Sequence, residues 1–150
     1  MQPQYKMVED KTGRYLPFIY LEELPFWEAA RQRQLKLQRC SDCRKTWFPI
    51  GSTCPHCFSM KWDWALLSGR GTLHNYVVFH KAWTKWFESR VPYAVVQVEL
   101  EEGPRLTTNL LDCDLKDIRI GMPVEAAFED ITDEITLLQF RPRLVAIHSA

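Results

Sequence analysis

Two close pairs of cysteines have the spacing of a metal site. Cys40 and Cys43 are separated by two residues, Cys54 and Cys57 likewise, and ten residues lie between the pairs. Four thiolates at this spacing can complete a tetrahedral shell around one zinc ion. Protein then fills all four ligand positions and leaves no place for a reactive water. The pattern therefore predicts a structural rather than a catalytic zinc centre, with one zinc per chain.

Iron is the main alternative metal, because a tetrahedron of four sulfurs suits iron as well as zinc. No second redox motif accompanies the cysteines, which favours zinc. His56 lies inside the second pair. Since structural zinc sites are four-coordinate, we interpret this histidine as an exposed bystander. Cys113 is the fifth cysteine, and we expect a buried or half-buried apolar residue there, as free cysteines usually are.

No catalytic set is evident in the sequence. It contains no serine elbow, Gly-rich phosphate loop or paired-histidine motif. His74 and His80 occupy positions of the same parity in a predicted strand, and we interpret both as polar strand residues rather than bases. We therefore assign no catalytic residue and expect no turnover by the chain alone.

The residues around the cysteines predict one helix and then strands. Pro25 fits a first helical turn, and a stripe of apolar residues predicts a helix over about 25–36. Alternating and β-branched runs predict five short strands, at 72–80, 93–100, 105–111, 124–128 and 134–140. Five such strands indicate a Greek-key barrel of the OB type, with 115–120 as a short bridging connection.

The predicted fold is mainly β with an N-terminal helix, in which a rubredoxin-like zinc ribbon precedes a five-stranded OB-fold barrel. We divide the chain into four parts: an N-terminal arm and helix at 1–36, the zinc ribbon at 37–65, the OB-fold domain at 66–142 and a C-terminal tail at 143–150. The first 24 residues mix charged and aromatic side chains. We expect them to form an extended arm whose order depends on a partner.

Composition and charge limit the classes of function. The chain has 150 residues, of which 46% are hydrophobic and 25% charged, as in a folded soluble protein. Its 19 basic and 19 acidic residues balance, which counts against bulk nucleic-acid binding. No apolar run approaches the ~20 residues of a membrane helix, and the first residues do not resemble a signal peptide. Paired cysteines without a disulfide framework suit a reducing cytoplasm, where we expect the protein to lie.

Several short motifs occur together in one known family. The chain resembles the zinc-ribbon plus OB-fold proteins first catalogued as domain of unknown function 35, over roughly residues 25–142. The motifs are LKLQRC at 35–40, FP at 48–49 between the cysteine pairs, SGRGT at 68–72, PY at 92–93, NLLDCD at 109–114, IGMPV at 120–124 and FEDITDE at 128–134. Each is weak alone, and in this order they are specific.

The resemblance implies an accessory subunit. Such proteins associate with thiolases and other acyl-CoA enzymes, and their OB domain packs on the catalytic subunit and can help form the passage for the CoA arm. Members also resemble subunits of steroid side-chain hydratases and of the thiolase that closes anaerobic toluene breakdown. The family often has glycine directly after each cysteine pair, where this chain has Arg44 and Phe58. We therefore expect some strain at these two turns, since glycine tolerates positive φ at the lowest cost.

An aromatic and basic segment at 80–93 is the second candidate for function. Its aromatic and basic side chains interleave: Lys81, Trp83, Lys85, Trp86, Phe87 and Arg90. A partner interface is favoured, because Trp and Arg are over-represented in interfaces. Binding the adenine and phosphates of CoA is the second interpretation, and binding single-stranded nucleic acid as an OB module is the third. The remaining alternative is that the aromatics only cap the barrel.

Overall fold

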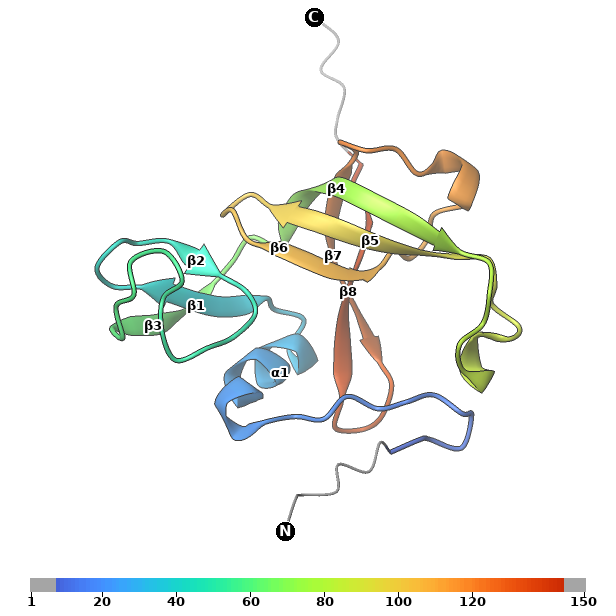
Figure 1. Ribbon diagram of the computed structural model, residues 1–150, viewed down its shortest axis with the longest axis horizontal. Helices are drawn as coiled ribbons and strands as arrows, with labels where there is room; N and C mark the ends of the chain where they lie inside the picture. The colour runs from blue at the N-terminus through green and yellow to red at the C-terminus, as the bar shows by residue number, and fades with distance from the viewer. Residues whose placement is uncertain (1–7, 145–150) are drawn as a thin grey trace, which may run out of the picture.

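Two β lobes and a short helix make up the described part of the protein, residues 8–144 of a computed structural model (Figure 1). The smaller lobe is a three-stranded sheet and the larger a five-stranded barrel. Residues 1–7 and 145–150, parts of the predicted arm and tail, lie outside the described residues. The elements in chain order are η1 (Leu21–Glu23), α1 (Leu24–Arg31), β1 (Lys36–Cys40), β2 (Thr46–Trp47), β3 (Trp62–Leu66), β4 (Arg70–Phe79), η2 (Lys85–Phe87), β5 (Tyr93–Leu100), β6 (Arg105–Asn109), η3 (Leu115–Asp117), β7 (Pro123–Asp130) and β8 (Thr136–Pro142).

The larger lobe has the strand order of an OB fold. Its antiparallel sheet runs β6-β5-β4-β7-β8. The two edge strands approach each other through a parallel bridge between Leu110 and Phe140, and Thr108 Oγ1 donates to the carbonyl of Leu138 at 2.9 Å. The sheet is therefore a nearly closed barrel, and the predicted fold class is confirmed. No helix among residues 8–144 is long and apolar enough to cross a membrane.

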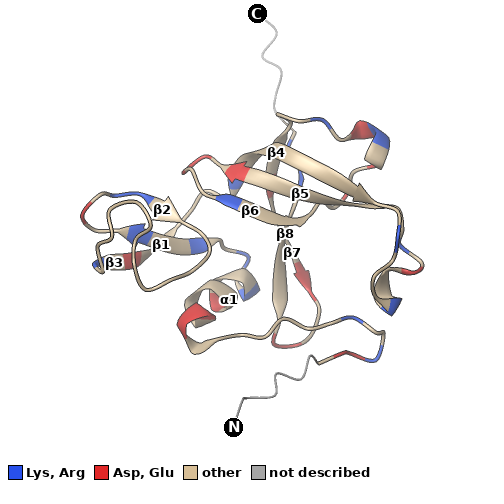
Figure 2. Cartoon of the chain, viewed as in Figure 1, with Lys and Arg blue, Asp and Glu red and all other residues tan. Residues whose placement is uncertain are grey.

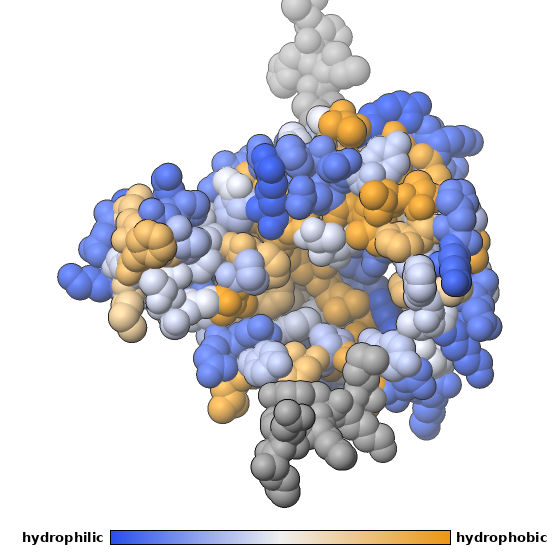
Figure 3. All heavy atoms as spheres, viewed as in Figure 1, coloured by the Kyte–Doolittle hydropathy of each residue, from blue (hydrophilic) through white to orange (hydrophobic). Residues whose placement is uncertain are grey.

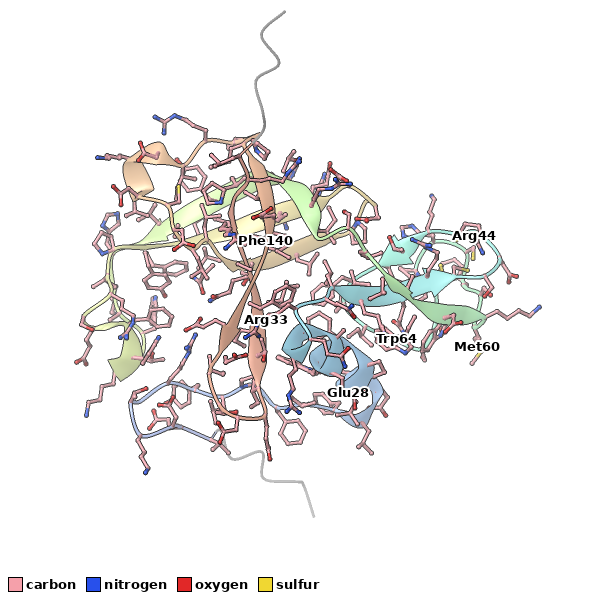
Figure 4. All side chains as sticks on the ribbon, turned by 180° about the vertical axis from the view of Figure 1, so that it is seen from behind. Glu28, Arg33, Arg44, Met60, Trp64 and Phe140 are labelled. Carbon is pink, nitrogen blue, oxygen red and sulfur yellow. The ribbon has the colours of Figure 1, made fainter. Side chains whose placement is uncertain are left out.

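Alternating side chains fill the barrel. Every second residue of β5 is buried, beginning at Ala94, and the residues between them are half-buried. Phe140 of β8 is completely buried among them, in the interior of the barrel (Figure 4). Burying one such side chain contributes about 1.5–3 kcal/mol. This strand pattern supplies most of the main hydrophobic core, which Phe26, Leu35 and Leu37 complete from outside the barrel.

The ribbon is held at one end by the barrel and at the other by the cysteines. Leu35 and Leu37, at the start of β1, belong to the same hydrophobic cluster as the barrel interior. A separate cluster at the far end contains Cys40, Trp47 and Cys54. Because this second cluster shares no residue with the first, the far end of the ribbon has no large core of its own and depends on its metal site.

The predicted helix over 25–36 is too long, because α1 ends at Arg31. Arg33 adopts the left-handed conformation with φ 59°, and the N–H of Gln34 turns back to the carbonyl of Ala29 at 2.9 Å. This is a usual way to end a helix. Arg33 Nη1 also donates to Asp130 at 2.7 Å, which anchors this turn between α1 and the β7–β8 hairpin (Figure 4).

The residues after this turn form β1 instead of a last helical turn. Leu37, which fits the helical stripe by spacing, is completely buried on a strand paired with β3. Short apolar runs fit a helix and a buried strand equally well. The local pattern therefore did not locate the change from helix to strand.

The predicted alternation along the first barrel strand is interrupted. A β-bulge shifts the register between Leu73 and Asn75, which reverses the faces of all later residues. Tyr76 consequently packs against the core cluster, whereas Val77 is 54% exposed on the outer surface. The expectation that His74 and His80 share a strand face is therefore wrong, since a bulge lies at His74 and β4 ends before His80.

Candidate functional site

The four cysteine sulfurs form a compact group at the far end of the ribbon. All lie within 4.8 Å of one another. The Cys40 and Cys57 sulfurs are 3.6 Å apart, and those of Cys43 and Cys54 are 3.7 Å apart. A zinc tetrahedron with arms of ~2.3 Å has edges of about 3.8 Å, whereas a disulfide bond measures about 2.05 Å. The sulfurs are therefore spaced for one shared metal ion.

Two matching turns position these sulfurs. In the first, the N–H of Arg44 donates to the carbonyl of Cys40 at 3.1 Å; in the second, Phe58 donates to Cys54 at 2.9 Å. The N–H of Cys43 also points at Cys40 Sγ from 3.5 Å and helps lower the pKa of that thiol to about 6. A thiol in this environment readily becomes the thiolate that a metal requires.

The strain expected at these turns is confirmed. Arg44 has φ 65° and Phe58 φ 61°, both in the left-handed region. A side chain there costs roughly 1–2 kcal/mol relative to ordinary backbone. Phe58 is 79% exposed, so its ring contributes little packing in return.

Phe58→Gly is therefore expected to stabilise the metal-bound ribbon by about 0.5–1 kcal/mol, because relief of the left-handed strain exceeds the added chain entropy of glycine. Zinc binding is coupled to folding of the ribbon, so competition with a chelator should show about two- to fivefold tighter retention. Phe58→Ala removes the ring and keeps the strain, and it serves as the control. Equal retention by both variants would contradict the prediction.

A second feature is a cavity of ≈ 390 Å³ at one end of the barrel. It lies between the barrel and the β4–β5 loop, where Figure 3 shows a hollow. Its walls come from five places: the N-terminal arm (Arg14), the loop (Trp86, Phe87, Arg90), the start of β5 (Tyr93, Ala94), the β6–η3 segment (Leu110, Leu111, Cys113, Asp114, Leu115) and the β7–β8 pair (Glu129, Gln139). The loops between the first two and the last two strands are those with which OB folds bind ligands.

Arg14 joins the arm to this end of the barrel. Its guanidinium donates two hydrogen bonds to the Glu129 carboxylate, at 2.8 and 3.1 Å. These bonds hold the pKa of Glu129 below its ordinary value. Arg14 also lies over the Trp86 ring at 4.8 Å, and Arg90 lies over the same ring at 3.4 Å. Two cations therefore contact the Trp86 ring at the rim of the cavity.

Gln139 offers an unused polar group on the cavity wall. The side chain is only 4% exposed, and its Oε1 has no hydrogen-bond partner among the described residues. A buried carbonyl oxygen without a donor is costly. The cavity thus presents an acceptor on its wall and cations at its rim.

The six predicted loop residues divide into two groups. Trp86, Phe87 and Arg90 line the cavity, and the Phe87 ring stacks on Tyr93 at 4.2 Å. The others lie outside the lining. Of these, Lys81 and Lys85 are exposed, and Trp83 is 68% exposed with Lys81 Nζ over its ring at 4.6 Å.

The structure also shows where the two remaining candidate residues, His56 and Cys113, lie. His56 is exposed, as predicted, and lies beside the metal site. Cys113 is half-buried on the cavity wall, and burial raises the pKa of its thiol. A thiol with a raised pKa is a weak nucleophile. Among residues 8–144, the four cysteines are the group of His, Cys, Asp and Glu side chains close enough to share a metal ion.

Sequence reasoning missed Arg14, Glu129 and Gln139. Arg14 and Glu129 are 115 positions apart, and although Glu129 lies in the FEDITDE motif, nothing in that motif indicates a partner in the N-terminal arm. Gln139 lies between two apolar residues in the last strand. This position predicts a side chain on the outer surface. The OB topology itself was the available signal, because it brings the first and last hairpin loops to one end of the barrel.

Fold and metal site together define a class: a zinc-ribbon protein with a C-terminal OB-fold barrel. Comparisons with known families give the same division. Residues 27–63 match the family described as ChsH2, rubredoxin-like zinc ribbon domain, and residues 64–129 match ChsH2, C-terminal OB-fold domain. The chain belongs to this ChsH2 or DUF35 family, as its sequence resemblance implied.

Some relatives in the family are named scaffold proteins, and others are named subunits of an enzyme. The chain is 37% identical over 110 residues to a DUF35 domain-containing scaffold protein of Methanocaldococcus jannaschii, covering 72% of this chain and 77% of the relative. It is 45% identical over 132 residues to a probable enoyl-CoA hydratase alpha subunit of Thermomonospora curvata, covering 88% of this chain. The match spans only 41% of that longer relative.

A solved structure resembles nearly the whole described chain. It is a chain of an Ltp2-ChsH2(DUF35) aldolase, with a TM-score of 0.75 and 42% sequence identity. The match covers 85% of this chain and 98% of that one. The resemblance therefore extends over both lobes.

Proposed function

We propose that this protein is a non-catalytic accessory subunit of an acyl-CoA-processing enzyme complex, with a thiolase-like or other acyl-CoA enzyme as its catalytic partner. The observation that carries the proposal is the 42% identity to a DUF35 chain in an aldolase assembly, over 98% of that chain. The scaffold and hydratase-subunit names of other relatives support it. On this proposal the protein acts in the cytoplasm, where thiolates stay reduced.

In this proposal Cys40, Cys43, Cys54 and Cys57 bind one structural zinc ion. The sulfur spacing supports this role, as does the match to a zinc ribbon family. The metal would cross-link the far end of the ribbon, with no open position for chemistry. The division of the chain into four parts, at 1–36, 37–65, 66–142 and 143–150, stays part of this proposal.

The barrel-end cavity is proposed to receive part of the acyl-CoA as it enters the partner. Arg14 and Arg90 at the rim suit phosphate groups, and the Gln139 oxygen suits an amide N–H of the CoA arm. Trp86, Phe87 and Arg90 line this passage, whereas Lys81, Trp83 and Lys85 lie outside it and would contact the partner. A nucleic-acid role is less supported, because the formal net charge is zero.

The test is affinity purification of the tagged chain from its native source, followed by identification of bound proteins. We expect an acyl-CoA enzyme in stoichiometric amount, and no cleavage, hydration or hydrolysis of acyl-CoA thioesters by the chain alone. Recovery of single-stranded nucleic acid in place of such an enzyme, with salt-dependent affinity, would instead support the OB-module alternative.

A further inference from the structure

Exposed apolar side chains gather where the N-terminal arm meets α1. Leu21 is 81% exposed, Tyr20 48%, and both Leu24 and Phe48 38%. We call these four residues the apolar ridge. Hydrophobic atoms protrude over the start of α1 in Figure 3. Isolated apolar residues are common on protein surfaces, but a group of large ones usually marks an interaction site.

Packed aromatic rings and a backbone hydrogen bond fix the position of the ridge. Phe26 is 8% exposed in α1, and its ring lies 6.4 Å from that of Phe48 and 5.3 Å from that of Trp27. The N–H of Glu23 donates to the carbonyl of Tyr20 at 3.0 Å, which fixes the chain just before the helix. Such anchors lose little conformational entropy when a partner covers them.

The η1 and α1 side of the ridge is acidic. Between Arg14 and Arg31 the sequence contains Glu22, Glu23 and Glu28 and no lysine or arginine. None of the ion pairs among residues 8–144 uses these three glutamates. Figure 2 shows the acidic colour on η1 and α1, across the molecule from the basic loop that follows β4. Glutamates that form no ion pair beside an apolar ridge favour a partner whose surface carries positive charge.

The ridge is a better protein anchor than the aromatic loop. Two of the three loop aromatics, Trp86 and Phe87, are half-buried by contacts within the chain. They are therefore partly covered, and Leu21 at 81% is more exposed than Trp83, the third loop aromatic, at 68%. Interfaces concentrate their energy in a few anchors that become fully buried.

We infer that the apolar ridge is the main surface by which this chain docks on its catalytic partner, and that the partner presents an apolar groove bordered by lysine and arginine. This inference rests on the proposed function and names the surface that carries it. Leu21 is the central anchor, and Glu22 and Glu28 pair with the basic border. The cavity at the barrel end remains free for the ligand.

The test uses the acyl-CoA enzyme that copurifies with the chain, produced separately and titrated with each variant by calorimetry. Leu21→Ser is expected to weaken binding at least tenfold, as for a central anchor. Val77→Ser is the matched control: Val77 is 54% exposed on the outer face of β4, and we expect less than a twofold change. The double variant Glu22→Gln, Glu28→Gln should weaken binding and flatten its dependence on salt.

The outcomes separate this inference from the proposed function. If the wild-type chain binds the enzyme and Leu21→Ser binds equally well, the ridge is not the docking surface and the accessory role stands. If no acyl-CoA enzyme copurifies with the wild type, the proposed function fails first. If sedimentation shows a wild-type dimer that Leu21→Ser dissociates, the ridge joins two copies of this chain and the inference is overturned. Zinc content and thermal unfolding confirm that each variant folds.

Discussion

Replacing Cys54 by serine is expected to release the metal and unfold the far end of the zinc ribbon while the barrel stays folded. Cys54 is completely buried in the cluster with Cys40 and Trp47. A structural zinc ion contributes apparent binding free energies of about 10–16 kcal/mol in small zinc-binding peptides, and few apolar contacts can replace it here. The barrel core is a separate cluster, so it should keep its structure.

Elemental analysis and hydrogen exchange test this prediction together. The wild type should contain one zinc per chain, and the variant less than a tenth of that. Backbone amides of β2 should exchange freely in the variant, and those of β5 should remain protected. Cys113→Ser is the control, because Cys113 lies outside the metal group and should retain full zinc. A metal-free variant with a fully protected ribbon would refute the structural role of the metal. Iron in the wild type would show that the assignment of zinc is wrong.

The second large effect is expected from Trp86→Ala. Arg14 and Arg90 both lie over the Trp86 ring at the cavity rim, and removal of the ring leaves the two cations without this aromatic contact. If the cavity receives the CoA arm, the acyl-CoA concentration for half-maximal turnover by the complex should rise about tenfold or more, as for loss of an aromatic stacking contact worth about 1–3 kcal/mol.

Comparison with Trp83→Ala isolates this effect. Trp83 is 68% exposed and does not line the cavity, so its removal should leave that concentration unchanged while weakening contact with the partner. Unchanged zinc content and thermal unfolding would show that both variants keep the fold. If Trp86→Ala supports turnover with the wild-type acyl-CoA dependence, the aromatic loop only covers the barrel.

The features that the sequence predicted well are determined by residues close to one another in the sequence. The metal site follows from two short turns, each built within six residues, and the sulfurs meet because two such turns pack together. The barrel strands follow from local runs of alternating or β-branched residues, such as the β-branched run of β5, in which every second residue is buried. Even the strain at Arg44 and Phe58 could be anticipated, because it is local to the turn.

The features that the sequence did not reveal depend on distant contacts. α1 ends at Arg31, and the Arg33 side chain of the turn that follows pairs with Asp130, 97 positions away. The cavity depends on Arg14 meeting Glu129 and Trp86, and no spacing rule connects these residues. The bulge in β4 reversed the faces of a strand whose alternation looked regular. Tertiary packing decided each of these cases.

Reconstitution of turnover tests the accessory role most directly. The catalytic partner and this chain are purified separately, and acyl-CoA conversion is measured for the partner, for this chain and for their equimolar mixture. We predict no conversion by this chain, weak or no conversion by the partner, and full conversion by the mixture. Full conversion by the partner alone, unchanged when this chain is added, would contradict the role as a required subunit.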